Sequence, residues 1–156
     1  MEFHGHAHTA GDVIVFCPQK GAIATGDMIM GLIPNFGDGF PRPWPKAIDS
    51  VAHLEFSQIL PGHGPLQSNR QRMTDQRNYI EELTDKVAAA KHAGRSVTDV
   101  QKTISIDSLK SMQSDGYAGY LAMNHTRFLP DFEPAALLRN ALEGNIADVY
   151  KNLDRV

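Results

Sequence analysis

Three residues that can bind a metal ion lie in glycine-containing turns of the sequence. His8 begins the segment His-Thr-Ala-Gly-Asp, Asp27 ends the segment Thr-Gly-Asp, and His63 is the central residue of Pro-Gly-His-Gly-Pro. Glycine lets the backbone bend tightly, so a side chain on such a turn can point into a cleft. Imidazole and carboxylate groups together suit zinc or a similar divalent ion. The residue types therefore predict a metal site, while each residue taken singly is also typical of a turn with side-chain hydrogen bonds to the backbone.

Each of these turns adjoins a predicted strand. The run 12–17 is apolar and rich in β-branched residues, and a second such run, 22–25, follows after a turn at 18–21. Two runs joined by a short glycine-containing turn are typical of a β-hairpin. Neither run alternates between apolar and polar residues, so we expect both strands to be buried on both faces. A third strand is predicted over 57–60, directly before the turn that carries His63.

The rest of the sequence predicts a long loop and several helices. Glycine and proline punctuate 31–45, which predicts a loop. Apolar residues recur at helical spacing in 46–54, 68–92, 115–128 and 133–153, and Ser96 is a candidate N-cap for a further short helix. The order of elements predicts an α+β fold. We expect a β-rich segment over 1–66 and a helical segment over 67–156 that packs on it and extends the chain.

Composition excludes several classes of protein. The 156 residues are enough for one domain with a hydrophobic core. A net charge of -3 and a pI near 6.1 argue against nucleic-acid binding, which requires clustered Lys and Arg. No apolar run approaches the ~18 residues of a membrane helix, no signal-peptide pattern is visible, and the single cysteine cannot form an internal disulfide. We therefore expect a cytoplasmic protein that binds neither nucleic acid nor membrane.

Taken together and in order, the three turn segments resemble the later motifs of the metallo-β-lactamase fold superfamily. The resemblance covers roughly residues 3–66 by motif, and the joint pattern is more specific than any one segment. It implies the C-terminal half of an αββα sandwich with a helical C-terminal extension. It also implies that His8 is a histidine ligand of the first zinc, that Asp27 is the catalytic carboxylate bridging both metals, and that His63 is a ligand of the second metal.

The same resemblance implies a chemistry. In the complete fold, two metals hold a bridging water and lower its pKa, and the resulting hydroxide attacks a polarised carbonyl group. We therefore expect a hydrolase that acts on a small-molecule ester, thioester, lactone or amide. Zinc is the expected metal, and iron and manganese also suit histidine and aspartate ligands. The residues do not name the substrate.

One family motif, His-x-His-x-Asp-His, has no counterpart in the sequence. It would supply further ligands and would precede His8, where the sequence has only a short segment. We therefore expect this chain to correspond to the C-terminal half of a longer protein. We also expect the chain alone to bind metal weakly and to be weakly active or inactive, because a zinc site needs four ligands, or three and a water.

Two alternatives belong to other classes of function. A non-catalytic module is expected to form homo-oligomers, or to pair with the missing N-terminal half, through an uncovered sheet face or strand edge. A non-catalytic metal-binding module would use His4, His6 and His8, since alternate residues of an extended segment share a face. The other interpretation of His4 and His6 is an exposed, frayed N-terminus.

Three further residues carry predictions of their own. Asp12 is expected to be a turn or capping residue. Cys17 lies in an apolar strand and is expected to be a small buried residue, not a nucleophile. Trp44 is expected either to line a substrate cleft or to anchor the long loop in the core.

Overall fold

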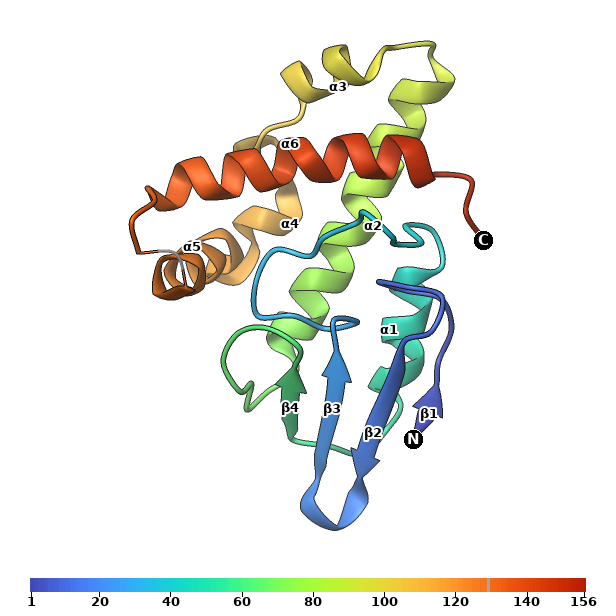
Figure 1. Cartoon of the computed structure of the whole chain (residues 1–156), viewed down its shortest axis with the longest axis vertical. Helices are drawn as coiled ribbons and strands as arrows, with labels where there is room; N and C mark the ends of the chain where they lie inside the picture. The colour runs from blue at the N-terminus through green and yellow to red at the C-terminus, as the bar shows by residue number, and fades with distance from the viewer. Residues whose placement is uncertain (129) are drawn as a thin grey trace.

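A four-stranded sheet forms one end of the molecule, and helices form the rest (Figure 1). The computed structural model describes residues 1–128 and 130–156 and has the α+β fold that the sequence predicts. The sheet has the order β1-β2-β3-β4, with β1, β2 and β3 antiparallel and β4 parallel to β3. The strands are β1 (Glu2–Phe3), β2 (Val13–Cys17), β3 (Ala22–Gly26) and β4 (Gln58–Pro61).

The predicted hairpin and the third strand are confirmed as β2, β3 and β4. The strand β1 was not predicted, because two residues are too few to show a periodicity. A short 3-10 helix, η1 (Pro18–Lys20), and Gly21 make the turn between β2 and β3. Gly21 has φ 57°, a left-handed conformation that glycine adopts without steric cost.

The helices follow the predicted segments within a few residues. Ser96 accepts a hydrogen bond from the backbone N–H of Asp99 and caps α3, as expected. No helix of the described residues is long and apolar enough to cross a membrane. The helices are α1 (Trp44–Ala52), α2 (Gln71–His92), α3 (Val97–Thr103), α4 (Lys110–Gln113), α5 (Tyr117–Phe128) and α6 (Pro134–Asn152), with 3-10 turns η2 (Ile106–Ser108) and η3 (Ser114–Gly116) between α3 and α5.

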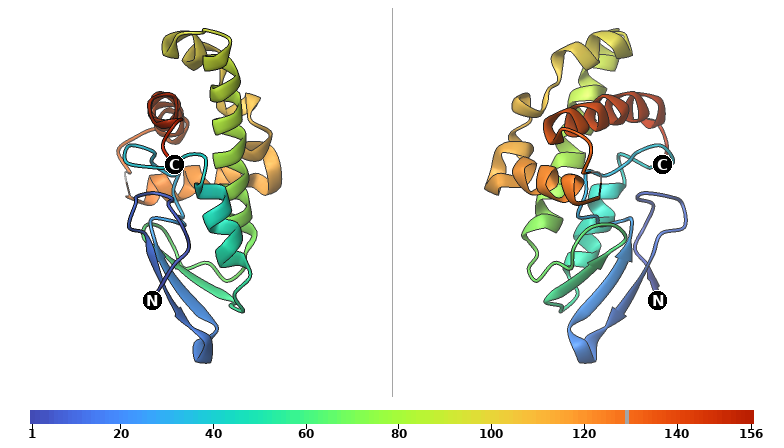
Figure 2. Two further views of the ribbon diagram at one scale, coloured as in Figure 1. Left: turned by 90° about the vertical axis from the view of Figure 1, so that its right-hand side faces the viewer. Right: turned by 60° about the vertical axis from the view of Figure 1, so that its left-hand side comes forward.

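Among the described residues, helices cover one face of the sheet and leave the other open. Ile14, Ile23 and Ile59 are buried and belong to one hydrophobic core with residues of α1 and α2, which lie on the same side of the sheet in Figure 2. On the opposite face, Val13 is 50% exposed and Val15 is 48% exposed. The prediction that both strands are buried on both faces is therefore wrong.

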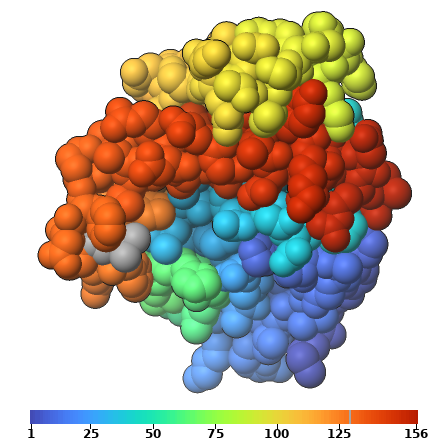
Figure 3. Space-filling view, turned by 45° about the horizontal axis from the view of Figure 1, so that its top comes forward, coloured from blue at the N-terminus to red at the C-terminus, as the bar shows by residue number. Residues whose placement is uncertain are grey.

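The long loop before α1 is anchored in the core. Trp44 is fully buried, and its Nε1 donates a hydrogen bond to the Met28 carbonyl, 3.0 Å away. From α6, Asn145 Nδ2 donates to the Pro34 carbonyl and Asn152 Nδ2 donates to the Phe36 carbonyl, each over 2.8 Å. Figure 3 shows α6, in red, lying across the blue-to-cyan loop. Of the two interpretations of Trp44, the structure favours loop anchoring.

We expect Asn145→Ala to lower the free energy of unfolding by about 1–3 kcal/mol. Asn145 Nδ2 also donates to the hydroxyl of buried Tyr79. The substitution therefore leaves the Pro34 carbonyl oxygen and the Tyr79 hydroxyl oxygen without this donor. Urea denaturation measures the change. Asn140→Ala, at an exposed position of the same helix, is the control and should change stability by less than about 0.5 kcal/mol. Equal losses in both variants would contradict this account.

Candidate functional site

Asp27 and His63 meet at one end of the sheet. Asp27 directly follows β3 and His63 lies two residues after β4, and the C-terminal ends of these parallel strands are adjacent (Figure 1). His63 Nδ1 lies 2.8 Å from Asp27 Oδ1, within hydrogen-bond distance. The His63 side chain is 61% exposed and the Asp27 side chain 28%. The structure therefore joins two of the three predicted site residues, in a place that solvent can reach.

Glycine on both sides of His63 allows this approach. A Cβ placed on Gly62 would lie 2.1 Å from Asp27 Oδ1, which is far inside contact distance. Gly64 has φ +102°, and a Cβ there would lie 2.6 Å from the Cα of Gly31. The backbone N–H of Gly31 donates to the His63 carbonyl over 2.7 Å. The turn after β4 thus packs directly against the chain after β3, and side chains at these glycines would force the two apart.

His8 lies in the loop that leads into β2. Because β2 is antiparallel to β3, this loop reaches the same end of the sheet as Asp27. The His8 side chain is partly buried, and its ring centroid lies 5.8 Å from that of Trp44 in an edge-on arrangement. Within residues 1–128 and 130–156, no three His, Cys, Asp or Glu side chains gather closely enough to hold a metal ion. His8 therefore shares the sheet end with the Asp27–His63 pair and is not part of a formed cluster.

The other N-terminal histidines have separate partners. His4 Nδ1 lies 2.8 Å from Ser50 Oγ, and its Nε2 lies 3.0 Å from a carboxylate oxygen of Glu2. His6 packs against the ring of Phe40 with centroids 4.6 Å apart. These contacts hold the two imidazoles to different neighbours, so the three-histidine arrangement is not formed.

Asp12 lies in the turn before β2, and Cys17 is the last residue of β2. Asp12 accepts hydrogen bonds from the backbone N–H and the hydroxyl of Thr9, over 2.7 and 3.1 Å, which confirms it as a turn residue. Cys17 is only partly buried, where the sequence predicted a buried residue. The reason is that it alternates onto the face of β2 that no helix covers.

Amide side chains from distant helices hold the segment that follows Asp27. Gln76 on α2 is fully buried; its Oε1 accepts from the Met30 N–H over 2.8 Å, and its Nε2 donates to the Met28 carbonyl over 2.9 Å. From α5, Asn124 Nδ2 donates to the Gly31 carbonyl over 2.9 Å. Sequence reasoning missed both residues, because a single polar residue in a helix gives no sign of a partner dozens of residues away.

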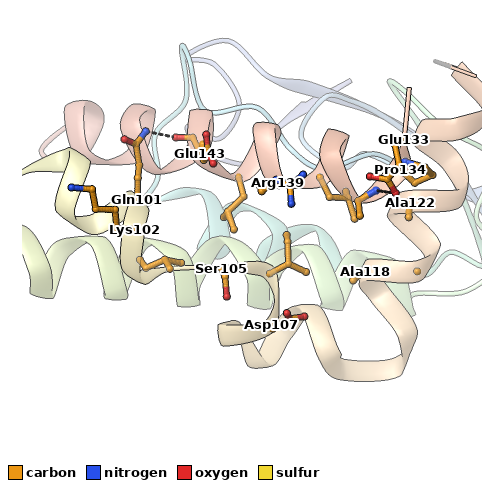
Figure 4. Close-up of a pocket in the computed structure, with 16 residues that line it drawn as sticks. Gln101, Lys102, Ser105, Asp107, Ala118, Ala122, Glu133, Pro134, Arg139 and Glu143 are labelled. Atoms are coloured by element: carbon orange, nitrogen blue, oxygen red, sulfur yellow. Dashed lines mark hydrogen bonds between the residues drawn. The ribbon is translucent and has the colours of Figure 1, made fainter. Parts of the chain in front are cut away.

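A separate pocket lies among the helices, away from Asp27 and His63. It has a volume of about 550 Å³ and is formed by α3, η2, α5 and α6 (Figure 4). Five charged residues contribute to its lining: Lys102, Asp107, Glu133, Arg139 and Glu143. None of the predicted site residues lines it. The apolar part of the lining comes mainly from Ile104, Ile106, Ala118, Ala122, Leu138 and Leu142.

Comparison with known proteins gives no family for the chain. No protein-family model matches the sequence, and no curated protein matches it. At the common end of β3 and β4, the carboxylate of Asp27 and the imidazole of His63 are in contact. Two donors are fewer than a zinc site requires, so the described residues alone do not form a complete metal site.

We expect Gly62→Ala to separate Asp27 from His63 and to lower the free energy of unfolding by about 1–3 kcal/mol. The added Cβ would overlap Asp27 Oδ1, so one of the two turns must move. Amide chemical shifts of residues 26–31 and 61–65 report the movement, and urea denaturation reports the stability. Gly119→Ala is the control, because nothing lies within 4 Å of its Cβ position in α5. If the site shifts stay unchanged in Gly62→Ala, the close packing of the turns is wrong.

A second prediction concerns His125 on α5. Its Nε2 accepts a hydrogen bond from the Ile33 N–H over 3.3 Å, which requires the neutral ring, and burial lowers its pKa from the ordinary 6.5. A histidine with a lowered pKa contributes stability above pH 6.5 that is lost as the pH falls toward the folded-state pKa. The unfolding free energy of the unsubstituted chain should therefore fall between about pH 7 and pH 5 more steeply than that of His125→Gln. His92→Gln, at an exposed position, is the matched control, and identical pH profiles for all three proteins would contradict the prediction.

Proposed function

We propose that this chain carries part of the metal site of a divalent-metal-dependent hydrolase, with Asp27 and His63 as ligands. The observation that supports the proposal is the 2.8 Å contact between His63 Nδ1 and Asp27 Oδ1 at the common end of β3 and β4. Neighbouring donors of one tetrahedral zinc ion lie about 3.3 Å apart, given bonds of about 2.0 Å. A small side-chain rotation would therefore bring both donors to a single ion.

His8 is the third ligand in this proposal. The resemblance of the turn segments assigns His8 to one metal position and His63 to a second, with Asp27 between them. The antiparallel pairing of β2 and β3 supports this assignment, because it brings the His8 loop to the sheet end that carries Asp27. Because His8 is assigned to the first metal position and His63 to the second, the two side chains need not be in contact.

The remaining ligands would come from another polypeptide segment with the pattern His-x-His-x-Asp-His. Three protein ligands divided between two metal positions are too few, since each zinc ion needs three or four protein ligands. We propose that the chain alone binds metal weakly and that the supplied segment completes both positions. Zinc is the favoured ion, and iron or manganese would also suit the donors.

The proposed reaction is hydrolysis of a small-molecule ester, thioester, lactone or amide. Metal ions in such a site lower the pKa of a bound water and polarise the substrate oxygen. This chain contributes by holding the Asp27 carboxylate against His63 and by leaving the two side chains accessible to a substrate. The 61% exposure of the His63 side chain supports access by a substrate.

The alternative of a metal site on His4, His6 and His8 has less support. His4 and His6 are directed to Ser50 and Phe40, and a shared ion would require both contacts to break. The alternative of a non-catalytic oligomerising module has an observation in its favour, the exposed apolar face of the sheet.

Weak metal binding by the chain alone can be measured by paramagnetic line broadening with Mn²⁺. We expect the amide signals of residues 27 and 62–64 to broaden first, and the midpoint of the titration to rise at least about 10-fold in His63→Ala, because a ligand is lost. His92→Ala, at an exposed position on α2, is the control and should titrate like the unsubstituted chain. Broadening that begins near His4 and His6, or that is the same in His63→Ala, would contradict the proposed site.

The hydrolase itself requires the completed site. The chain should be combined with a polypeptide that carries His-x-His-x-Asp-His, and zinc content and hydrolysis of a p-nitrophenyl ester should be measured before and after mixing. We expect zinc to be retained and ester hydrolysis to appear only in the mixture, and Asp27→Asn to abolish the gain. Failure of the combined polypeptides to retain any metal would exclude this function.

A further inference from the structure

The side chains of Glu2, His4 and Ser50 form a chain of contacts between the N-terminal segment and α1. His4 Nδ1 lies 2.8 Å from Ser50 Oγ, and His4 Nε2 lies 3.0 Å from Glu2 Oε2. His4 directly follows β1, and Ser50 lies in the last turn of α1. A hydroxyl within hydrogen-bond distance of an imidazole that a carboxylate orients is the arrangement of a serine nucleophile and its base.

The partners of His4 determine which of its ring nitrogens carries the proton. An ionised carboxylate can only accept, so a neutral His4 ring donates to Glu2 from Nε2. Its Nδ1 then holds a lone pair, and the Ser50 hydroxyl donates to it. In the triad of serine proteases the two nitrogens are exchanged, but each nitrogen takes its role from its own hydrogen bond. The Ser50 hydroxyl is therefore directed at a base that can accept its proton.

Ordered elements hold these groups in place from both sides. The strand β1 pairs with β2, which fixes the backbone of Glu2 in the sheet. The helix α1 is anchored in the core by Trp44 and Val51, which are both fully buried. The His4 side chain is only 11% exposed, so few other orientations are open to it. A nucleophile and a base held together in this way lose little conformational entropy when they react.

Ser50 is accessible to a reagent, and its partner distinguishes it from another exposed serine. Ser50 is exposed on α1, while the imidazole that accepts its hydrogen bond is largely buried. Ser57 is also exposed, but its hydroxyl donates to the Gly21 carbonyl over 3.5 Å. A backbone carbonyl is not a base that can take the proton of a hydroxyl. Ser50 and Ser57 therefore differ in activation and not in exposure.

We propose that Ser50 is a nucleophile that accepts an acyl group from a carboxylic ester, with His4 as its general base and Glu2 as the residue that positions His4. Ser50 Oγ forms a bond to the ester carbonyl carbon, and the bond from that carbon to the leaving oxygen breaks. The Ser50 proton passes to His4 Nδ1 and then to the leaving oxygen, which departs as an alcohol. The Glu2 carboxylate stabilises the imidazolium that forms between these two transfers.

The acylation of Ser50 is independent of the proposed metal site. It uses none of the proposed ligands His8, Asp27 and His63, so it should proceed with EDTA present. One acylation releases one alcohol per chain, whereas the completed metal site would hydrolyse an ester continuously. Failure of Ser50 to react would leave the metal proposal untouched, and failure of metal binding would leave the Ser50 proposal untouched.

Labelling with a fluorophosphonate in EDTA tests the nucleophile, because this probe bonds covalently to activated serine oxygens and releases fluoride. We expect peptide mass mapping to find the adduct on Ser50, forming at least about 10-fold faster than any adduct on Ser57 of the same chain. His4→Gln should lower the Ser50 rate at least about 10-fold, because the base is lost. His92→Gln, at an exposed position on α2, is the matched control and should leave the rate unchanged.

Circular dichroism checks that both histidine variants are folded, so that a lower rate reports the lost base. Equal rates at Ser50 and Ser57, no adduct on Ser50, or an unchanged Ser50 rate in His4→Gln would overturn the proposal. Glu2→Gln keeps an acceptor for the His4 N–H and removes its charge, so we expect a rate between those of the unsubstituted chain and His4→Gln. A Glu2→Gln rate equal to that of the unsubstituted chain would overturn the role of Glu2.

Acetylation by p-nitrophenyl acetate in EDTA tests whether the activated hydroxyl takes an acyl group. We expect peptide mass mapping to place an acetyl group on Ser50 in preference to Ser57, and Ser50→Ala to lose this product. Ser57→Ala is the matched control and should be acetylated at Ser50 like the unsubstituted chain. An acetyl group that remains on His4 would make the imidazole the nucleophile and would overturn the assignment of Ser50.

Discussion

The close packing of the turn after β4 against the chain after β3 determines where the Asp27 and His63 side chains lie. Gly62 faces Asp27 Oδ1 with no room for a Cβ, and Gly64 packs on Gly31 with left-handed backbone geometry. Parallel pairing of β3 and β4 brings the turns to one edge, and the glycines let them touch. The 2.8 Å contact between Asp27 and His63 is a consequence of this packing.

The helices stabilise the same region from the other side. Gln76 and Asn124 bind backbone groups of residues 28–31, and Asn145 and Asn152 bind carbonyls of the loop beyond. Each of these amide side chains is buried, so each lost hydrogen bond would expose a backbone group to an apolar interior. The helical segment therefore does more than extend the chain: it fixes the path of the loop that follows Asp27.

The sheet presents two features that a stable isolated domain does not need. One is the accessible Asp27–His63 pair, and the other is an apolar outer face with half-exposed Val13 and Val15. Strand β3 contributes to both, because Ala22 and Ala24 point outward from it and its C-terminal end leads into Asp27.

The sequence by itself determined the strands β2, β3 and β4, the longer helices and the α+β class. These follow from local rules, since apolar periodicity, capping residues and glycine turns act over a few neighbouring residues. The joint resemblance of the turn segments also predicted His8, Asp27 and His63 as metal ligands. Only the tertiary structure decided that Asp27 touches His63, that His8 packs on Trp44, and that Val13 and Val15 face outward without a cover. The physical reason is that contact and burial depend on which segments pack together, and a run of apolar residues has the same pattern whether both of its faces are covered or only one.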